Sequence, residues 1–299
     1  MKLNLVGPFI VNFPLGTEIA FSKGLKQLGH EVFEVDPNID VQMVGLRNDA
    51  DVTVVFKSCV GSEKYLKGLN GPIVVYQPDD ARFQHIRSMM VEMKKYSDLF
   101  LSFDDYGTVV AKSMGYKSAE TLLLTADPEL YSPDDSLIRD IDISFIGSLG
   151  DPVAHASRRK MISIVESHAK LRGWRTAFGQ TQDMPVLVDI YRRSKIVLNH
   201  ATDVGQAFGH GFGLQCRHFE VGMTSTCLLS NTILGTSETA NSMPFLKFDS
   251  EDSLMTKIEY LLESGAWADL GEEMFKNMQS DHMPVKRSQE LVDFIVRSM

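Results

Sequence analysis

The chain has 299 residues, of which 43% are hydrophobic and 23% are charged, and its formal net charge is −9. This is the composition of a globular protein that can form one large or two medium domains. The apolar runs are shorter than the ~20 residues of a membrane-spanning helix, and the negative charge disfavours broad non-specific binding to nucleic acid, which requires a basic surface.

The N-terminus and the cysteines favour a cytoplasmic protein. The first residues, MKLNLVGPFIV, are apolar, but no small-residue cleavage site follows them, so we expect a first strand rather than a signal peptide. The three cysteines, Cys59, Cys216 and Cys227, have no CxxC or other metal-binding spacing. This pattern favours free thiols in a reducing cytosol.

The first half of the chain predicts a parallel sheet with intervening helices. Short apolar runs bounded by turn residues predict strands at 2–9, 30–37, 51–58, 71–80, 98–103 and 120–127. Helical spacing is present at 16–28 and 106–114. The opening strand–helix–strand unit is typical of a doubly wound sheet, although it lacks the GxGxxG fingerprint of dinucleotide-binding proteins.

The second half predicts another domain of the same architecture. Its expected strands are 142–150, 173–180, 195–198, 227–229 and 243–250, and its expected helices are 155–172, 184–193, 251–263, 268–279 and 284–298. Between the halves, DPELYSPDD (127–135) is a Pro- and Asp-rich linker. We expect a Rossmann-like domain at 1–130, a second at 131–280, and a C-terminal helix at 281–299, with a cleft between the two domains.

The most informative stretch is 194–231. A predicted strand ending at Asn199 is followed by a glycine-rich loop and then by Arg217 and Glu220, one turn apart near the start of a crossover helix. A glycine loop that leads to a helix N-terminus is a common anion site, and an arginine beside it can hold phosphate in a bidentate fork. The alternative is a surface ion pair beside a mobile loop.

Two aspartates, Asp79 and Asp80, lie at the carboxyl end of the predicted strand 71–80. A carboxylate in that place can face a cleft and accept a proton from a hydroxyl group. The alternative is that one of them caps the following helix. His85, on that helix, is another candidate base.

Several blocks, in order and over nearly the whole chain, resemble the CgeB-like (spore-maturation-type) glycosyltransferases, a branch of the GT-B superfamily. They are LGHEVFEVDP (28–37), VVYQPDD (74–80), ADPELYSP (126–133), DISFIGSL (142–149), SKIVLN (194–199), CRHFEVG (216–222) and HMPVKR (282–287). The resemblance implies two Rossmann-like doubly wound α/β domains facing a cleft, with the C-terminal helix packing back on the first. It also implies an acceptor in the first domain and a nucleotide-sugar donor in the second.

The resemblance also implies roles for single residues. Glu220 looks like the second glutamate of a Glu-x7-Glu pair and would hold the ribose, but Phe212 stands where the first glutamate is expected. This departure puts the role of the first glutamate in doubt. The phosphates of the donor would lie against two features of the second domain. One is the turn that follows its first strand, and the other is a pair of arginines. The expected donor site consists of Gly147, Ser148, Arg158, Asn199, His200, His210, Gly211, Arg217 and Glu220.

The function that follows is transfer of a hexosyl or pentosyl group from a nucleotide-diphosphate sugar to a hydroxyl acceptor. A UDP-sugar is the favoured donor, and no cofactor or bound metal is expected. The acceptor is a glycan, a polymer or a modified nucleobase such as a hydroxymethylated DNA base. If transfer inverts the configuration at the anomeric carbon of the sugar, Asp79 or Asp80 would be the base. If the configuration is retained, the departing diphosphate can take the proton.

Two other functions stay open. One is a nucleotide-sugar epimerase-like enzyme, which would use the same donor cleft without an acceptor. The other is a non-catalytic binding protein on a GT-B scaffold. A nucleic-acid acceptor, although not favoured by the net charge, would require a basic groove in the first domain, and otherwise these residues form an ordinary solvated face: Lys57, Lys64, Arg82, Arg87 and Lys94.

Overall fold

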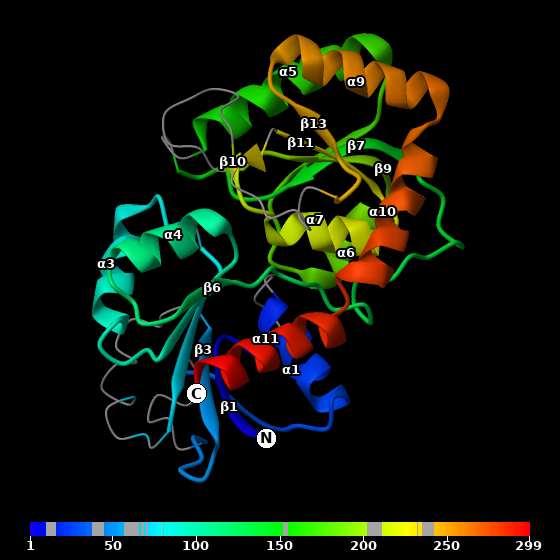
Figure 1. Cartoon of the computed structure of the whole chain (residues 1–299). Helices are drawn as coiled ribbons and strands as arrows, with labels where there is room; N and C mark the ends of the chain where they lie inside the picture. Colours follow the sequence, from blue (N-terminus) through cyan, green and yellow to red (C-terminus); the bar gives the residue numbers. More distant parts are fainter. Residues whose placement is uncertain are drawn as a thin grey trace. The chain divides into compact units, whose positions relative to one another are not determined.

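The protein folds into two compact units. The computed structural model describes residues 1–9, 16–37, 45–56, 66, 69, 71–79, 81–151, 155–201, 211–231, 233–234 and 242–299. Residues 1–127 and 283–299 form one unit, and residues 128–282 form the other. Each unit has its own parallel sheet with flanking helices (Figure 1). The prediction of two doubly wound α/β domains is therefore confirmed.

The first unit is built on a six-stranded parallel sheet in the order β2-β1-β3-β4-β5-β6. Its strands are β1 Lys2–Val6, β2 Glu31–Val35, β3 Val52–Phe56, β4 Ile73–Gln77, β5 Leu99–Ser102 and β6 Ala119–Thr121. Its helices are α1 Thr17–Gln27, α3 Gln84–Met93, α4 Asp105–Ser113 and α11 Pro284–Ser298. All residues of β3 and β4 are buried, as expected for central strands covered on both faces.

Helix α11 ends the chain but packs along α1 in the first unit (Figure 1). The two helices approach so closely that a Cβ atom on Gly24 would lie 2.5 Å from the carbonyl oxygen of Pro284. The hydroxyl of Ser288 donates a hydrogen bond of 3.1 Å to the carbonyl of Phe21. The last helix is therefore an integral part of the first unit.

The second unit contains a five-stranded parallel sheet in the order β13-β11-β9-β7-β8. Its strands are β7 Ile141–Ile146, β8 Thr176–Gly179, β9 Ser194–Asn199, β11 Cys227–Asn231 and β13 Leu246–Phe248. Its helices are α5 Ala156–Arg172, α6 Met184–Arg193, α7 Cys216–Met223, α9 Glu251–Ser264 and α10 Trp267–Asp281. A short parallel pair that the sequence did not predict joins β10 Gly211–Phe212 to β12 Ile233–Leu234.

The strand order identifies where a ligand would bind in each sheet. In the second unit the first strand, β7, lies between β8 and β9. The chain therefore moves to one side of β7 and then returns to the other, which creates a topological switch point between β7 and β9. In open α/β sheets, ligands bind beyond the carboxyl ends of the strands at such a point. The first unit has its own switch point, between β1 and β3.

Most predicted strands extend beyond the observed ones, and two of them show why. The segment predicted at 120–127 pairs only over Ala119–Thr121, and its leucines are buried beyond the end of the strand. The segment predicted at 243–250 is paired only over Leu246–Phe248. An apolar run in a sequence indicates buried residues. In these two segments apolar residues stay buried beyond the point where the hydrogen bonds between strands end.

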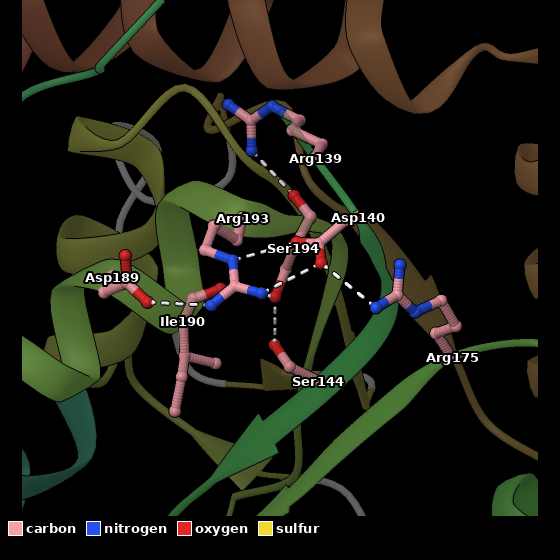
Figure 2. A network of polar contacts seen from close by, with 8 residues as sticks. All are labelled: Arg139, Asp140, Ser144, Arg175, Asp189, Ile190, Arg193 and Ser194. Carbon is pink, nitrogen blue, oxygen red and sulfur yellow. Dashed lines mark hydrogen bonds and ion pairs between the residues drawn. The ribbon is translucent and has the colours of Figure 1, made fainter. Parts of the chain in front are cut away.

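Charged side chains at the amino ends of β7 and β9 neutralise one another (Figure 2). The carboxylate of Asp140 accepts hydrogen bonds from Arg193, at 2.8 Å from Nε and 2.9 Å from Nη2, and Arg175 lies 3.3 Å away. The guanidinium of Arg139 donates to the carbonyl of Ser194 at 2.7 Å. This edge of the sheet is therefore occupied by a structural network.

The close approach of α1 and α11 generates a first prediction. Gly24→Ala should lower the free energy of unfolding by about 1–3 kcal/mol, because the added methyl group meets the backbone of α11 and the helices must separate. Gly150→Ala is the control, since a Cβ atom there has no neighbour within 4 Å. Urea unfolding of both variants measures the difference. Equal stability of the two variants would show that α11 does not hold this position in solution.

Candidate functional site

The sequence-predicted donor residues that the structure describes lie at the carboxyl edge of the second sheet. β7 ends at Ile146 and is followed by Gly147 and Ser148, while the neighbouring strand β9 ends at Asn199 and is followed by His200. These segments flank the switch point between β7 and β9. The topology therefore places two separately predicted sequence blocks side by side.

Arg217 joins the ends of these two strands. From the first turn of α7, its Nη1 donates to the side-chain oxygen of Asn199 at 2.6 Å, and its Nη2 donates to the carbonyl of Ile146. Its Nε lies 3.4 Å from the hydroxyl of Tyr191, and its guanidinium lies 4.8 Å from the ring centroid of Phe145. The guanidinium group is thus held from several directions.

Gly147 is required for this arrangement. A Cβ atom at this position would lie 2.6 Å from Nη2 of Arg217, well inside van der Waals contact. The sequence suggested Gly147 and Arg217 as two separate phosphate-facing residues. The structure makes them a pair, because the missing side chain of one leaves room for the guanidinium of the other.

Arg158 brings a second guanidinium group to the same edge. It lies in the first turn of α5 and is 9% exposed, and it donates to the carbonyl of His200 at 2.9 Å and to that of Ser148 at 3.2 Å. Burial, followed by the positive charge of Arg217, lowers the pKa of Arg158 to about 9. Both of these hydrogen bonds go to neutral carbonyl oxygens, and the positive charge of Arg217 lies close enough to act on Arg158.

Glu220 lies one turn after Arg217 on α7. Its side chain is buried, and burial raises its pKa to about 7 against the opposing effects of Arg217 and of the hydroxyls of Tyr131 and Tyr191. Burial also raises the pKa of both tyrosines, so their hydroxyls stay protonated. Glu220 is therefore a carboxyl group that gains its charge near neutral pH, beside two hydroxyl donors.

The structure brings Tyr131 and Tyr191 to the site, although sequence reasoning had missed both. Tyr191 lies near the end of α6, where its position is indistinguishable from that of an ordinary core residue. Tyr131 lies in the segment predicted to be a linker. A large aromatic side chain in an otherwise Pro- and Asp-rich connection was the available signal, since such a residue in a loop often has a binding role.

The side chains of Asn199 and His200 are buried and contact other residues of the second unit. The amide of Asn199 accepts from Arg217 and donates to Ser230 at 3.0 Å, so it positions the guanidinium group. His200 is buried, its Nδ1 lies 2.7 Å from the carbonyl of Ala201, and its ring centroid is 6.3 Å from that of Phe248. His210 lies outside the described residues, and only the backbone of Gly211, in β10, is described. Their roles at a ligand stay predictions.

The proposed catalytic residues lie on the first unit. Asp79 follows β4, and its backbone N–H donates to the side chain of Gln77 at 3.1 Å. Asp80 is outside the described residues. The N-cap of α3 is Phe83, so the alternative that an aspartate caps this helix is wrong. His85 is exposed on α3, with its ring centroid 5.6 Å from that of Phe83. Their catalytic roles stay predictions.

The described segments contain neither the side-chain cluster of a metal site nor a helix that could span a membrane. No group of three or more His, Cys, Asp or Glu side chains in those segments has the arrangement of a metal site. Likewise, each helix in them is too short or too polar to traverse a lipid bilayer.

A family model described as glycosyl transferase-like matches residues 139–293, which include every residue described above at the carboxyl edge of the second sheet except Tyr131. This chain belongs to that family. The glycosyltransferase function expected from the sequence is therefore confirmed at the level of the family. A comparison with curated proteins finds no relative.

Solved structures with the same fold match the glycosyl transferase-like chain over almost its whole length. An α-glucosyltransferase in complex with UDP and a 13-mer DNA matches with a TM-score of 0.72 and 14% identity, over 99% of each chain. Sucrose-phosphate synthase from Thermosynechococcus elongatus has a TM-score of 0.65 and 10% identity, over 99% of this chain and 98% of that one. HepE from Anabaena, in complex with UDP and glucose, has a TM-score of 0.63 and 11% identity, over 99% of this chain and 100% of that one. These likenesses confirm the predicted GT-B fold.

The raised pKa of Glu220 generates a prediction for the ligand-free protein. Between pH 4.5 and about 7 the folded state keeps a proton that the unfolded state has released, so the free energy of unfolding falls as pH rises through this window. Between pH 4.5 and pH 8, the free energy of unfolding of the wild type should fall by up to about 3 kcal/mol more than that of Glu220→Gln. Denaturant unfolding of both proteins at several pH values measures this difference. Parallel pH profiles would contradict the assignment.

Proposed function

We propose that this glycosyltransferase takes its sugar from a nucleoside diphosphate donor bound at the carboxyl edge of the second sheet, with a UDP-sugar as the favoured donor. The observation that carries the proposal is the buried guanidinium group of Arg158 beside the half-buried one of Arg217, at the switch point between β7 and β9. UDP in the structures of the α-glucosyltransferase and of HepE supports the choice of nucleotide.

The charge at this edge suits the chemistry of glycosyl transfer. When the bond between the sugar and the diphosphate breaks, negative charge develops on the departing phosphate oxygen. Fixed positive groups lower this barrier because they need no reorganisation at the moment of reaction. Arginine has five N–H donors, and the three hydrogen bonds that Arg217 makes to described residues leave two N–H groups that could donate to phosphate oxygens.

Glu220 is proposed to hold the ribose. A carboxylate accepts hydrogen bonds from two neighbouring hydroxyl groups, and ribose presents such a pair. Because the pKa of Glu220 is about 7, the bound ribose would draw the group into its charged form at neutral pH. Glucose and UDP-glucose in the similar structures support a hexosyl rather than a pentosyl group.

The first unit is proposed to bind the acceptor, with Asp79, Asp80 or His85 as the base if the reaction inverts the sugar. The assignment to the CgeB-like branch is also a proposal, based on the order of the sequence blocks. Phe212, at the position of the first glutamate of the family's pair, keeps a non-catalytic binding protein as the opposing hypothesis.

Binding of the donor provides the test. UDP at 100 times its dissociation constant should stabilise the protein by about 2.7 kcal/mol, which a thermal-shift measurement detects. Arg217→Lys should weaken UDP binding at least about tenfold, because lysine cannot reproduce the planar fork. The control is Arg175→Lys, at the opposite edge of the sheet, where the side chain is 70% exposed.

Release of UDP from UDP-glucose then separates catalysis from binding alone. A protein that binds UDP but releases none from any UDP-sugar, with or without acceptors, would support the non-catalytic hypothesis. A protein that binds no uridine, guanosine, adenosine or cytidine nucleotide would contradict the donor site itself.

A hydroxymethylated DNA base is a second candidate acceptor, favoured by the DNA in the similar α-glucosyltransferase structures. Of the basic residues expected to line a DNA groove, Lys57 and Lys64 lie outside the described residues. The side chain of Arg87 is bound to the carbonyl of Ala81 at 2.7 Å and to the hydroxyl of Tyr106 at 2.6 Å. Together with the net charge of −9, these contacts make the basic groove less favourable.

Fluorescence anisotropy with labelled DNA carrying this base tests the second candidate. If DNA is the acceptor, affinity should fall steeply between 50 and 200 mM salt, because phosphate contacts release counterions. We expect no such binding in the ~10⁻⁸–10⁻¹¹ M range of specific DNA complexes. Tight, salt-dependent binding together with transfer of glucose to the base would overturn this expectation.

A further inference from the structure

The segment that connects the two units is also part of the candidate site. Tyr131 is only 1% exposed, although it lies in the Pro- and Asp-rich segment. Arg192 of α6 fixes the backbone on both sides of it, with hydrogen bonds to the carbonyl of Ser132 at 2.7 Å and to that of Leu130 at 3.2 Å. A third bond, at 3.0 Å, goes to the hydroxyl of Ser132. The position of Tyr131 is therefore built into the second unit.

The hydroxyl of Tyr131 is buried and forms no hydrogen bond of ordinary length and angle with the described residues, although Glu220 lies near it. A buried hydroxyl in that state destabilises the folded protein, and phenylalanine would fill the same space without this penalty. It nevertheless lies close enough to Glu220 for each group to shift the pKa of the other. A polar atom retained at a cost in stability, beside a titrating carboxyl group, indicates a role in binding.

On the basis of the proposed donor site, we propose that Tyr131 is a positioning residue for the nucleotide. When a nucleoside diphosphate binds, the hydroxyl of Tyr131 donates a hydrogen bond to the carboxylate of Glu220 and turns it towards the ribose hydroxyls. The chemical class of the ligand is the ribose of a nucleoside diphosphate, with UDP as the probe.

Three surrounding elements provide the groups that act on Glu220. Arg217 lies one turn earlier on α7, Tyr191 approaches from α6, and Tyr131 approaches from the connecting segment. A carboxylate has four lone-pair sites, so two tyrosine hydroxyls leave room for the two hydroxyls of a ribose. Donors on one side of the carboxylate favour its charged form, which is the better acceptor for the ribose.

The test is the affinity for UDP of Tyr131→Phe, measured by titration calorimetry at pH 6, 7 and 8. We expect binding about tenfold weaker than that of the wild type at pH 7. The pH below which binding is lost should also move upwards, because loss of a hydroxyl donor raises the pKa of Glu220. The melting temperature without ligand should stay the same or rise, which separates this role from a structural one.

The matched control is Tyr96→Phe, which removes another buried hydroxyl without a hydrogen-bond partner, in the first unit. It should leave UDP binding unchanged. The double variant Tyr131→Phe with Glu220→Gln tests whether Tyr131 acts through the carboxylate of Glu220. If it does, Tyr131→Phe should cause no further loss of UDP affinity in a protein that already carries Glu220→Gln.

The outcomes distinguish the two levels of the proposal. UDP binding by Tyr131→Phe equal to the wild type, or an equal loss in the Glu220→Gln background, would overturn the positioning role and leave the donor site intact. If the wild type binds no nucleoside diphosphate, the donor site itself is wrong, and the role of Tyr131 fails with it.

Discussion

The candidate site depends on one half-buried guanidinium group, that of Arg217, held between the ends of two neighbouring strands. Asn199 at the end of β9 and the carbonyl of Ile146 at the end of β7 fix its position, and the absent side chain of Gly147 makes room for it. Because these partners are neutral, they orient the charge without cancelling it. A phosphate group would find its binding partners already in place, so little ordering would oppose binding.

The two edges of the second sheet use charge in opposite ways. At the amino edge, the carboxylate of Asp140 lies between Arg193 and Arg175, so the charges compensate one another. At the carboxyl edge, Arg158 and Arg217 lie close together, and burial lowers the pKa of Arg158. Two like charges close together favour an anionic ligand between them. In a chain with a net charge of −9, this local positive charge is one ground on which we propose a diphosphate at this edge.

The same reasoning applies to the carboxyl group of Glu220 and the hydroxyl of Tyr131. Each is buried at a cost in stability, and the two lie beside each other near the strand ends. Local departures from the most stable arrangement commonly mark functional sites. The family identifies a glycosyltransferase, and these features support the donor site that we propose in its second unit.

The sequence by itself determined the fold class, most strand positions and the helix that presents Arg217 and Glu220, because short buried strands and helical periodicity leave local patterns. The apolar run ending at 127 misled the strand prediction because a buried leucine run looks the same inside and outside a ladder. The contact of Gly147 with Arg217, the buried Arg158 and the inward position of Tyr131 came only from the tertiary structure. These residues lie far apart in the chain, and a parallel sheet brings them together through its strand order, which no local pattern records.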